Sequence, residues 1–280
     1  MKKIGVVGIG NMGSGIAQTL LKGGYEVAVY SRRCGRAGFD WEQDETVRPL
    51  VKAGAVVMPG LHEIAAFSEL VVTSLPMPED VEAVCTGADG LLEHMAPGSY
   101  LVDTSTIDVE TTRRIHEKAA EKGIRTLDAP VSGGPQGAKN GTMTMMVGGE
   151  KPDFDACMPV FQCIGGNINY MGPIGTGQMV KLCNQALSAT QSAVLGEVFV
   201  VGRKGGLDLD AMVNVIRTSS GDCWMLDNFF PETVLAKTYE PPKFALRMML
   251  KDIDLYMRTA KSLQAPSTIS GVVCQMFSAA

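Results

Sequence analysis

A lysine and two amides in the second half of the chain could form an acid–base centre. Lys181, Asn184 and Gln185 are spaced i, i+3 and i+4, so a helix would place all three on one face. They follow the glycine-rich segment 172–177, which puts the lysine near the first turn, where the helix macrodipole disfavours a cation. This field and partial burial should lower the pKa of the lysine toward the working range of a general acid.

A second pattern, in segment 128–135, could bind a carboxylate. The segment reads Asp-Ala-Pro-Val-Ser-Gly-Gly-Pro and follows a predicted strand at its carboxyl end, where open α/β sheets bind ligands. Gly133 and Gly134 would leave backbone N–H groups accessible, and Ser132 adds a hydroxyl. Taken alone the segment could be an ordinary turn, but together with the lysine helix it predicts a site for a small carboxylate-bearing substrate.

A third pattern, G-x-G-x-x-G, lies between a predicted strand and a predicted helix near the N-terminus. Gly8 would permit a tight turn, Gly10 the approach of a pyrophosphate, and Gly13 close packing of helix on strand. The phosphates would lie at the positive helix N-terminus, so the context predicts a dinucleotide site, with a ligand-free turn as the alternative. The six residues assigned to it are Gly8, Ile9, Gly10, Asn11, Met12 and Gly13.

The residues after the second predicted strand indicate which dinucleotide binds. A domain that prefers NAD would place an acidic residue there, whereas this chain has Ser31, Arg32 and Arg33. Guanidinium groups pair with a 2′-phosphate through charge-assisted bonds, so we expect NADP (NADPH) to be preferred over NAD. The alternative is that acidic residues of the following insertion, 34–45, engage the arginines instead. These acidic residues are Asp40, Glu42, Asp44 and Glu45.

The elements that must position these residues follow from the apolar pattern. Strands are predicted at 3–7, 27–30, 56–58, 70–74, 101–104, 126–128, 142–147 and near 168, and helices at 108–123 and 152–161. Several strands are apolar at consecutive positions and alternate with helical segments, which predicts a doubly wound, Rossmann-type α/β sheet. We expect this NADP-binding domain to span 1–172.

The remainder, 173–280, is expected to be an all-α domain for substrate binding and dimerisation. It would begin with an interdomain helix over about 177–204, roughly 42 Å long at 1.5 Å per residue. Exposed apolar residues such as Met248, Met249 and Leu255 predict a homo-oligomer, a dimer or a tetramer.

Composition excludes several other classes of protein. The 280 residues are 45% hydrophobic and 20% charged, which is typical of a globular chain, and the net charge of −5 offers no basic surface for nucleic acid. The cysteines form no C-x-x-C pair and the histidines are unclustered, so we expect no metal site and the reduced thiols of a cytoplasmic protein. Gly, Pro, Asn and Gln in the uncharged stretch 158–180 argue against a membrane span.

Five motifs in order give nearly the whole chain a resemblance to the β-hydroxyacid dehydrogenase family. They are GIGNMG at 8–13, DTST at 103–106, DAPVSGG at 128–134, GPIGTGQMVKLCNQ at 172–185, and SSGDCW at 219–224 followed by Lys251-Asp252. The resemblance implies hydride transfer between a nicotinamide cofactor and a small β-hydroxyacid or acid semialdehyde, with no metal and with Lys181 as general acid/base.

The resemblance also implies roles for further residues. Ser132, Gly133 and Gly134 would hold the substrate carboxylate. Leu75, Pro76 and Thr106 would line the dinucleotide site, and Phe244 and Lys251 would reach the cofactor from the second domain. Many members carry Asn four residues after the lysine, whereas here Asn184 stands three and Gln185 four after it, so either amide could orient the substrate.

Two activities within the family are consistent with the sequence, and they differ in substrate and cofactor. Ser31-Arg32 favours an NADP-dependent semialdehyde reductase. Arg247 resembles an arginine of the 3-hydroxyisobutyrate dehydrogenases that could bind the substrate carboxylate, so the alternative is a 3-hydroxyisobutyrate dehydrogenase that uses NAD. Arg247 could instead lie on a helix surface without a role in binding. A second alternative, a non-enzymatic NADPH-binding module, is disfavoured by the presence of Lys181.

Overall fold

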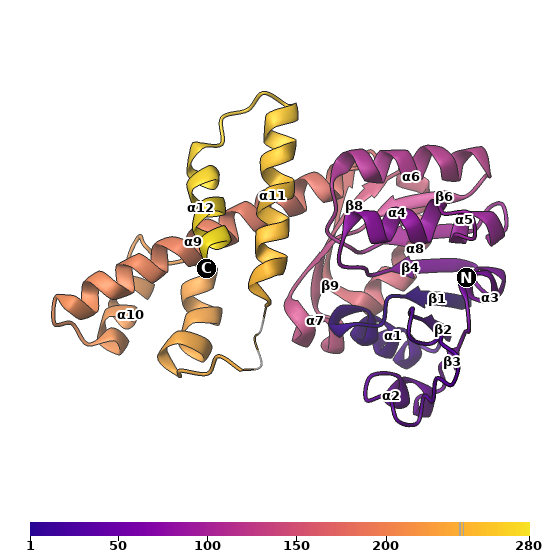
Figure 1. Cartoon of the computed structure of the whole chain (residues 1–280), viewed down its shortest axis with the longest axis horizontal. Coiled ribbons are helices and arrows are strands. Elements are labelled where there is room, and N and C mark those ends of the chain that lie inside the picture. Colours follow the sequence, from indigo (N-terminus) through magenta and orange to yellow (C-terminus); the bar gives the residue numbers. More distant parts are fainter. Residues whose placement is uncertain (241, 243) are drawn as a thin grey trace. The chain divides into compact units, whose positions relative to one another are not determined.

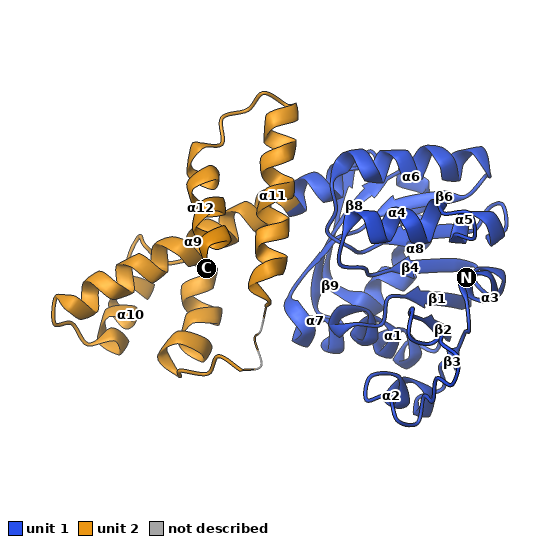
Figure 2. Ribbon diagram, viewed as in Figure 1, with its two compact units in different colours: residues 1–181 blue, residues 182–280 orange. Residues whose placement is uncertain are grey.

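The computed structural model describes residues 1–240, 242 and 244–280. The chain divides into two compact units, Met1–Lys181 and Leu182–Ala280 (Figure 2). The division falls within the long helix α9, Thr176–Lys204, rather than before it.

Unit 1 contains one sheet with strand order β3-β2-β1-β4-β5-β6-β8-β7, and β9 pairs with β8 (Figure 1). The strands are β1 Lys3–Val7, β2 Glu26–Tyr30, β3 Val56–Val57, β4 Leu70–Thr73, β5 Tyr100–Asp103, β6 Arg125–Asp128, β7 Val131–Ser132, β8 Met143–Gly149 and β9 Gly165–Gly172. The path from β3 to β6 is parallel, whereas β8 runs antiparallel to both β6 and β7. The predicted doubly wound fold is confirmed.

Helices cover both faces of this sheet because its strands are apolar on both sides. In β1, Ile4 and Val6 join the cluster packed by α1 and α8, whereas Val7 joins the cluster packed by α3 to α6. The helices of unit 1 before α9 are α1 Asn11–Lys22, α2 Val47–Lys52, α3 Leu61–Phe67, α4 Pro78–Thr86, α5 Leu91–His94, α6 Val109–Glu121, α7 Gly134–Asn140 and α8 Lys151–Ile164. Asp108 caps α6 by accepting a hydrogen bond from the Thr111 N–H at 2.7 Å.

Unit 2 consists of helices and loops in its described residues. After its part of α9 come α10 Leu209–Arg217, two short π-helices at Met225–Phe229 and Pro231–Leu235, α11 Leu246–Ser262 and α12 Thr268–Ala279. No helix in the described part of the chain is both long and apolar enough to cross a membrane.

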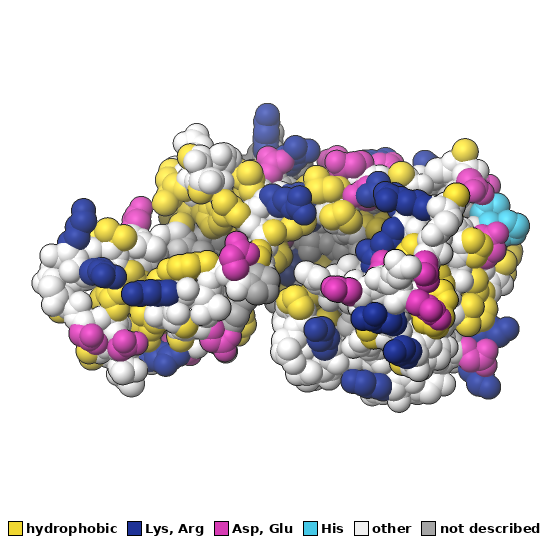
Figure 3. All heavy atoms as spheres, turned by 60° about the horizontal axis from the view of Figure 1, so that its bottom comes forward, with side chains coloured by type: hydrophobic (Ala, Val, Ile, Leu, Met, Phe, Trp, Pro, Cys, Tyr) yellow, Lys and Arg dark blue, Asp and Glu magenta, His cyan; other side chains and the backbone are white. Residues whose placement is uncertain are grey.

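The apolar surface of unit 2 differs from the expected one. Leu255 is only 4% exposed, because it lies on the inward face of α11, so its assignment to an exposed stripe was wrong. Exposed apolar residues lie on α9, where Leu187, Val194 and Val201 are among them. They also lie on α12, where Ile269, Val272 and Met276 follow each other at helical spacing. Figure 3 shows hydrophobic side chains gathered at the surface of this unit.

Candidate active site

The phosphate-binding turn joins β1 to α1 and has the geometry that its glycines require. Gly8 has φ +92°, and a Cβ there would lie 2.2 Å from the Ser74 carbonyl oxygen; a Cβ on Gly13 would lie 2.0 Å from the Gly8 oxygen. Gly10, by contrast, has no neighbouring atom within 4 Å of that position, and no side chain caps α1. An open backbone at a helix N-terminus fits a dinucleotide pyrophosphate.

A cavity of about 510 Å³ opens at the carboxyl end of β2. Arg32 lines it with an 81% exposed side chain, and its Nη2 lies 3.6 Å from an oxygen of Asp80 in the first turn of α4. The cavity is lined by Tyr30, Arg32, Gly35, Pro59, Gly60, Leu61, Ala83, Gly87, Ala88, Asp89 and Gly90. Its position and its guanidinium suit the adenosine end of a dinucleotide.

Arg33 has a different environment from Arg32. Its Nε lies 2.6 Å from Asp44 of the insertion, and its Nη2 donates to the Ile9 carbonyl oxygen at 3.4 Å. Asp44 in turn accepts the backbone N–H groups of Thr46 and Val47 at 2.9 Å, at the start of α2. An acidic residue of the insertion therefore engages Arg33, as the alternative prediction proposed, while Arg32 stays at the cavity.

The loops after β4 and β5 are held together by buried hydrogen bonds. Asp103 accepts the Thr73 hydroxyl at 2.7 Å and the Ser105 N–H at 3.1 Å, and the Ser105 hydroxyl accepts the Leu75 N–H at 2.9 Å. These bonds fix the segments that contain Leu75, Pro76 and Thr106 at the same edge of the sheet.

The glycine-rich segment after β6 continues as the short strand β7 and the helix α7, neither of which was predicted. Ser132 pairs with Thr144 of the antiparallel strand β8, the next strand along the chain. Gly133 and Gly134 follow with φ +135° and +63°, a conformation that favours glycine. Apart from its neighbours in the chain and the backbone of α7 itself, no atom lies within 4 Å of a Cβ placed on Gly134. The segment thus presents a hydroxyl and open backbone at the start of α7.

Lys181 lies in the second turn of α9 and is 6% exposed. The start of this helix is fixed by Asp128 at the end of β6, whose carboxylate accepts the N–H groups of Gly175 and Gln178, each at 2.7 Å. Burial raises the pKa of Asp128 to about 6, although these backbone hydrogen bonds act to lower it. The prediction missed this role of Asp128; an acidic residue at a strand end and an uncapped, glycine-rich helix start were the signals available.

The two amides after Lys181 differ in their surroundings. Gln185 is buried and donates to Asp252 of α11 at 2.5 Å, and the other oxygen of Asp252 lies 2.8 Å from the Lys251 ammonium. Asn184 is partly exposed and donates to the Gln185 side-chain oxygen at 3.1 Å. Of the two, Asn184 is the more accessible to a substrate.

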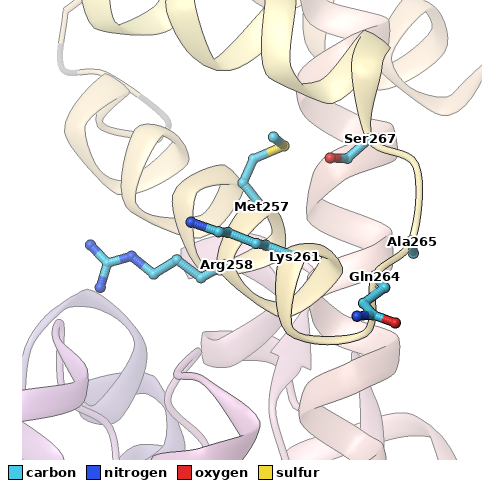
Figure 4. A pocket seen from close by; sticks show the side chains of 6 residues that line it. All are labelled: Met257, Arg258, Lys261, Gln264, Ala265 and Ser267. Carbon is cyan, nitrogen blue, oxygen red and sulfur yellow. The ribbon is translucent and has the colours of Figure 1, made fainter.

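The remaining predicted residues of unit 2 are Phe244 and Arg247, which are both exposed, before and within the first turn of α11. Neither lines the cavity of about 470 Å³ at the end of α11 and the loop that leads to α12 (Figure 4). That cavity is lined by Met257, Arg258, Lys261, Gln264, Ala265 and Ser267. Among the described residues, no group of three or more His, Cys, Asp or Glu could hold a metal ion.

Two family descriptions match the chain in succession. The NAD binding domain of 6-phosphogluconate dehydrogenase matches residues 3–172, and the NAD-binding domain of NADP-dependent 3-hydroxyisobutyrate dehydrogenase matches residues 175–280.

Proteins with a known name or structure are similar over nearly their whole length. A 3-hydroxyisobutyrate dehydrogenase of Pseudomonas aeruginosa is 35% identical over 99% of this chain and 92% of its own. An NAD-dependent L-serine dehydrogenase of the same organism is 34% identical, over 99% and 91%. Among solved structures, Mycobacterium tuberculosis 3-hydroxyisobutyrate dehydrogenase with L-serine has a TM-score of 0.87 at 28% identity, covering 99% of this chain and 93% of that one. Psf3 in complex with NADP+ and 2-OPP has a TM-score of 0.85 at 25% identity, covering 99% and 93%.

Proposed function

The chain belongs to the β-hydroxyacid dehydrogenase family, and from that premise we propose that it interconverts a small β-hydroxyacid and its semialdehyde. The single observation that carries the proposal is the position of the buried Lys181 on α9. Asp128 binds the start of this helix, and Asp128 also ends β6, the strand that leads to Ser132 and Gly133. This connection supports the proposal, because it links the residue proposed for proton transfer to the segment proposed to bind the carboxylate.

The reaction needs a hydride and a proton. A bound nicotinamide supplies the hydride for reduction and takes it up in oxidation. In reduction the Lys181 ammonium donates its proton to the carbonyl oxygen as that oxygen gains negative charge; in oxidation the neutral amine accepts the hydroxyl proton. Ser132, Gly133 and Gly134 hold the substrate carboxylate, and Asn184 orients the substrate.

For the cofactor we propose NADPH in preference to NADH. Ser31 and Arg32 would bind the 2′-phosphate at the cavity beside β2, and no acidic residue occupies the positions directly after that strand. A charge-assisted hydrogen bond contributes roughly 1.5–3 kcal/mol, which corresponds to about tenfold tighter binding or more.

A second candidate is NAD-dependent oxidation of a hydroxyacid such as 3-hydroxyisobutyrate or L-serine. It is favoured by the substrates in the names of the relatives and by the exposed Arg247, whose guanidinium could bind a carboxylate.

One experiment tests these readings. The purified chain is mixed with NADPH or NADH and a panel of small acid semialdehydes, and with NADP or NAD and the matching hydroxyacids, while absorbance of the reduced cofactor is followed. We expect reduction of acid semialdehydes with NADPH. Faster turnover of a hydroxyacid with NAD would support the second candidate, whereas tight NADPH binding with no turnover would support a binding module.

We also propose a homo-oligomer formed through unit 2. The exposed stripe Ile269, Val272 and Met276 on α12 would be buried against a second copy, because apolar area removed from water stabilises association. Light scattering after size exclusion should give at least twice the chain mass. The substitution Val272→Lys should shift the population toward the monomer.

A further inference from the structure

Gln178 is a fully buried side chain of α9, and both ends of its amide make hydrogen bonds. Its Nε2 donates to the Ser105 carbonyl oxygen at 2.9 Å, and its Oε1 accepts the Ile107 N–H at 3.2 Å. Its own backbone N–H is one of the two that bind Asp128. One residue therefore connects the loop after β5, the end of β6 and the first turn of α9.

The two backbone groups that Gln178 binds flank Thr106. The proposed function, on which this inference rests, places Thr106 at the dinucleotide and Lys181 at the substrate oxygen. Lys181 follows Gln178 by three residues, so the two side chains lie on the same side of one helix. A displacement of the loop relative to the helix would change the position of Lys181 relative to the nicotinamide.

We propose that Gln178 is the positioning residue that sets Lys181 against the nicotinamide-lining loop. The role requires a side chain that donates and accepts at once, as the amide does, because only such a group satisfies both the Ser105 oxygen and the Ile107 N–H. An apolar side chain would leave two buried backbone groups without partners, and an ionised carboxylate would leave the Ser105 oxygen facing a negative charge.

The first test substitutes an apolar side chain of similar length, Gln178→Met. A misplacement of about 1 Å can lower a rate by roughly 10²-fold, so we expect kcat to fall between about 10-fold and 100-fold. The Kd for NADPH should stay close to the wild-type value, because Gly10 and Arg32 lie on other loops. The exposed Gln162→Met on α8 is the matched control and should leave kcat unchanged.

The second test, Gln178→Glu, gives a signature that a general loss of stability would not give. A protonated carboxyl can donate to Ser105 and accept from Ile107 as the amide does, but an ionised one cannot donate. The charged groups connected to this site are Asp128, which accepts the backbone N–H of residue 178, Asp103, which accepts the Ser105 N–H, and Lys181, one turn further along α9. Burial and the two carboxylates favour the protonated form.

The kcat of Gln178→Glu relative to wild type should therefore rise as the pH falls, whereas the ratio for Gln178→Met should stay low throughout. Two results would overturn the positioning role: a Gln178→Met variant with wild-type kcat, or a Kd for NADPH that rises as much as kcat falls. Equal ratios for both variants at every pH would overturn it as well. If the wild-type chain binds NADPH but turns over none of the semialdehydes and hydroxyacids of the panel, the proposed function is wrong, and the positioning role of Gln178 is then wrong as well.

Discussion

The carboxyl ends of β2 and β6 belong to one sheet but hold their charged groups in opposite ways. At β2, Arg32 is largely exposed and meets Asp80 at a distance of 3.6 Å. At β6, Asp128 is 1% exposed and accepts two backbone N–H groups at 2.7 Å. Exposed ion pairs contribute about 0–1 kcal/mol and weaken with salt, whereas breaking a buried hydrogen bond costs about 1–3 kcal/mol.

The difference separates two properties of the site. In the proposed function, one or two exposed side chains at the end of β2 set the preference between dinucleotides, so substitutions there should change that preference with little effect on the fold. The end of β6 fixes the helix that carries Lys181, so a change there alters geometry and stability together.

The largest effect is expected for Lys181→Met. General acid/base groups contribute about 10²-fold to 10⁴-fold, so kcat should fall by that factor while the Kd for NADPH stays nearly unchanged. Lys181→Arg should not restore activity, because a guanidinium does not release its proton near neutral pH. Lys204→Met, at the exposed far end of α9, is the control. A Lys181→Met variant that keeps more than about a tenth of kcat would contradict the assignment.

The next effect concerns stability and Asp128→Asn. Burial raises the pKa of Asp128 from 3.8 to about 6, so the folded state binds a proton that the unfolded state lacks between these values. The resulting penalty on folding is fully present above pH 6 and disappears as the pH falls toward 3.8. The stability of the wild type relative to Asp128→Asn should therefore be greater at pH 4.5 than at pH 7.5, by roughly 2 kcal/mol.

Urea unfolding at the two pH values measures that difference, because other titrating groups cancel between the two proteins. A difference that does not change with pH would show that Asp128 titrates normally.

A smaller effect is expected at the carboxylate site. Gly133→Val places a β-branched residue at φ +135°, with its Cβ 3.4 Å from Met143 Cα, and should raise the KM for acid semialdehydes by roughly tenfold or more. The milder Ser132→Ala should act in the same direction without strain. An amide analogue that wild type turns over as well as the acid would show that no carboxylate binds there.

The smallest effect separates the two arginines. Arg32→Ala should weaken NADPH binding about tenfold and leave NADH binding unchanged, since the lost charge-assisted bond goes to the 2′-phosphate. Asp44→Asn should affect both dinucleotides equally, because it releases Arg33 and the insertion rather than a phosphate contact. Titration of each variant with both cofactors gives the ratio of its Kd to the wild-type Kd for NADPH and for NADH. If Arg32→Ala weakens binding of both cofactors equally, Arg32 does not bind the 2′-phosphate.

Local sequence patterns determined the sheet and the long helix. Apolar runs of four to five residues fixed the parallel strands, as in β1 and β4, because both of their faces are buried. The absence of strong helix breakers fixed α9, Thr176–Lys204, to within a residue of the predicted range. The G-x-G-x-x-G turn was also readable, since backbone conformation at Gly8 and the close packing of Gly13 depend on neighbours in sequence or in the adjacent strand.

Only the tertiary structure decided which polar groups meet. Asp128 binds N–H groups 47 and 50 residues away, and Gln178 binds the loop after β5 from 71 and 73 residues away, so no local spacing encodes these contacts. The different fates of Arg32 and Arg33 likewise depend on where Asp80 and Asp44 lie in space. Residue type and periodicity specify an element and its apolar face, but a buried polar group finds its partner only when the elements pack and exclude water.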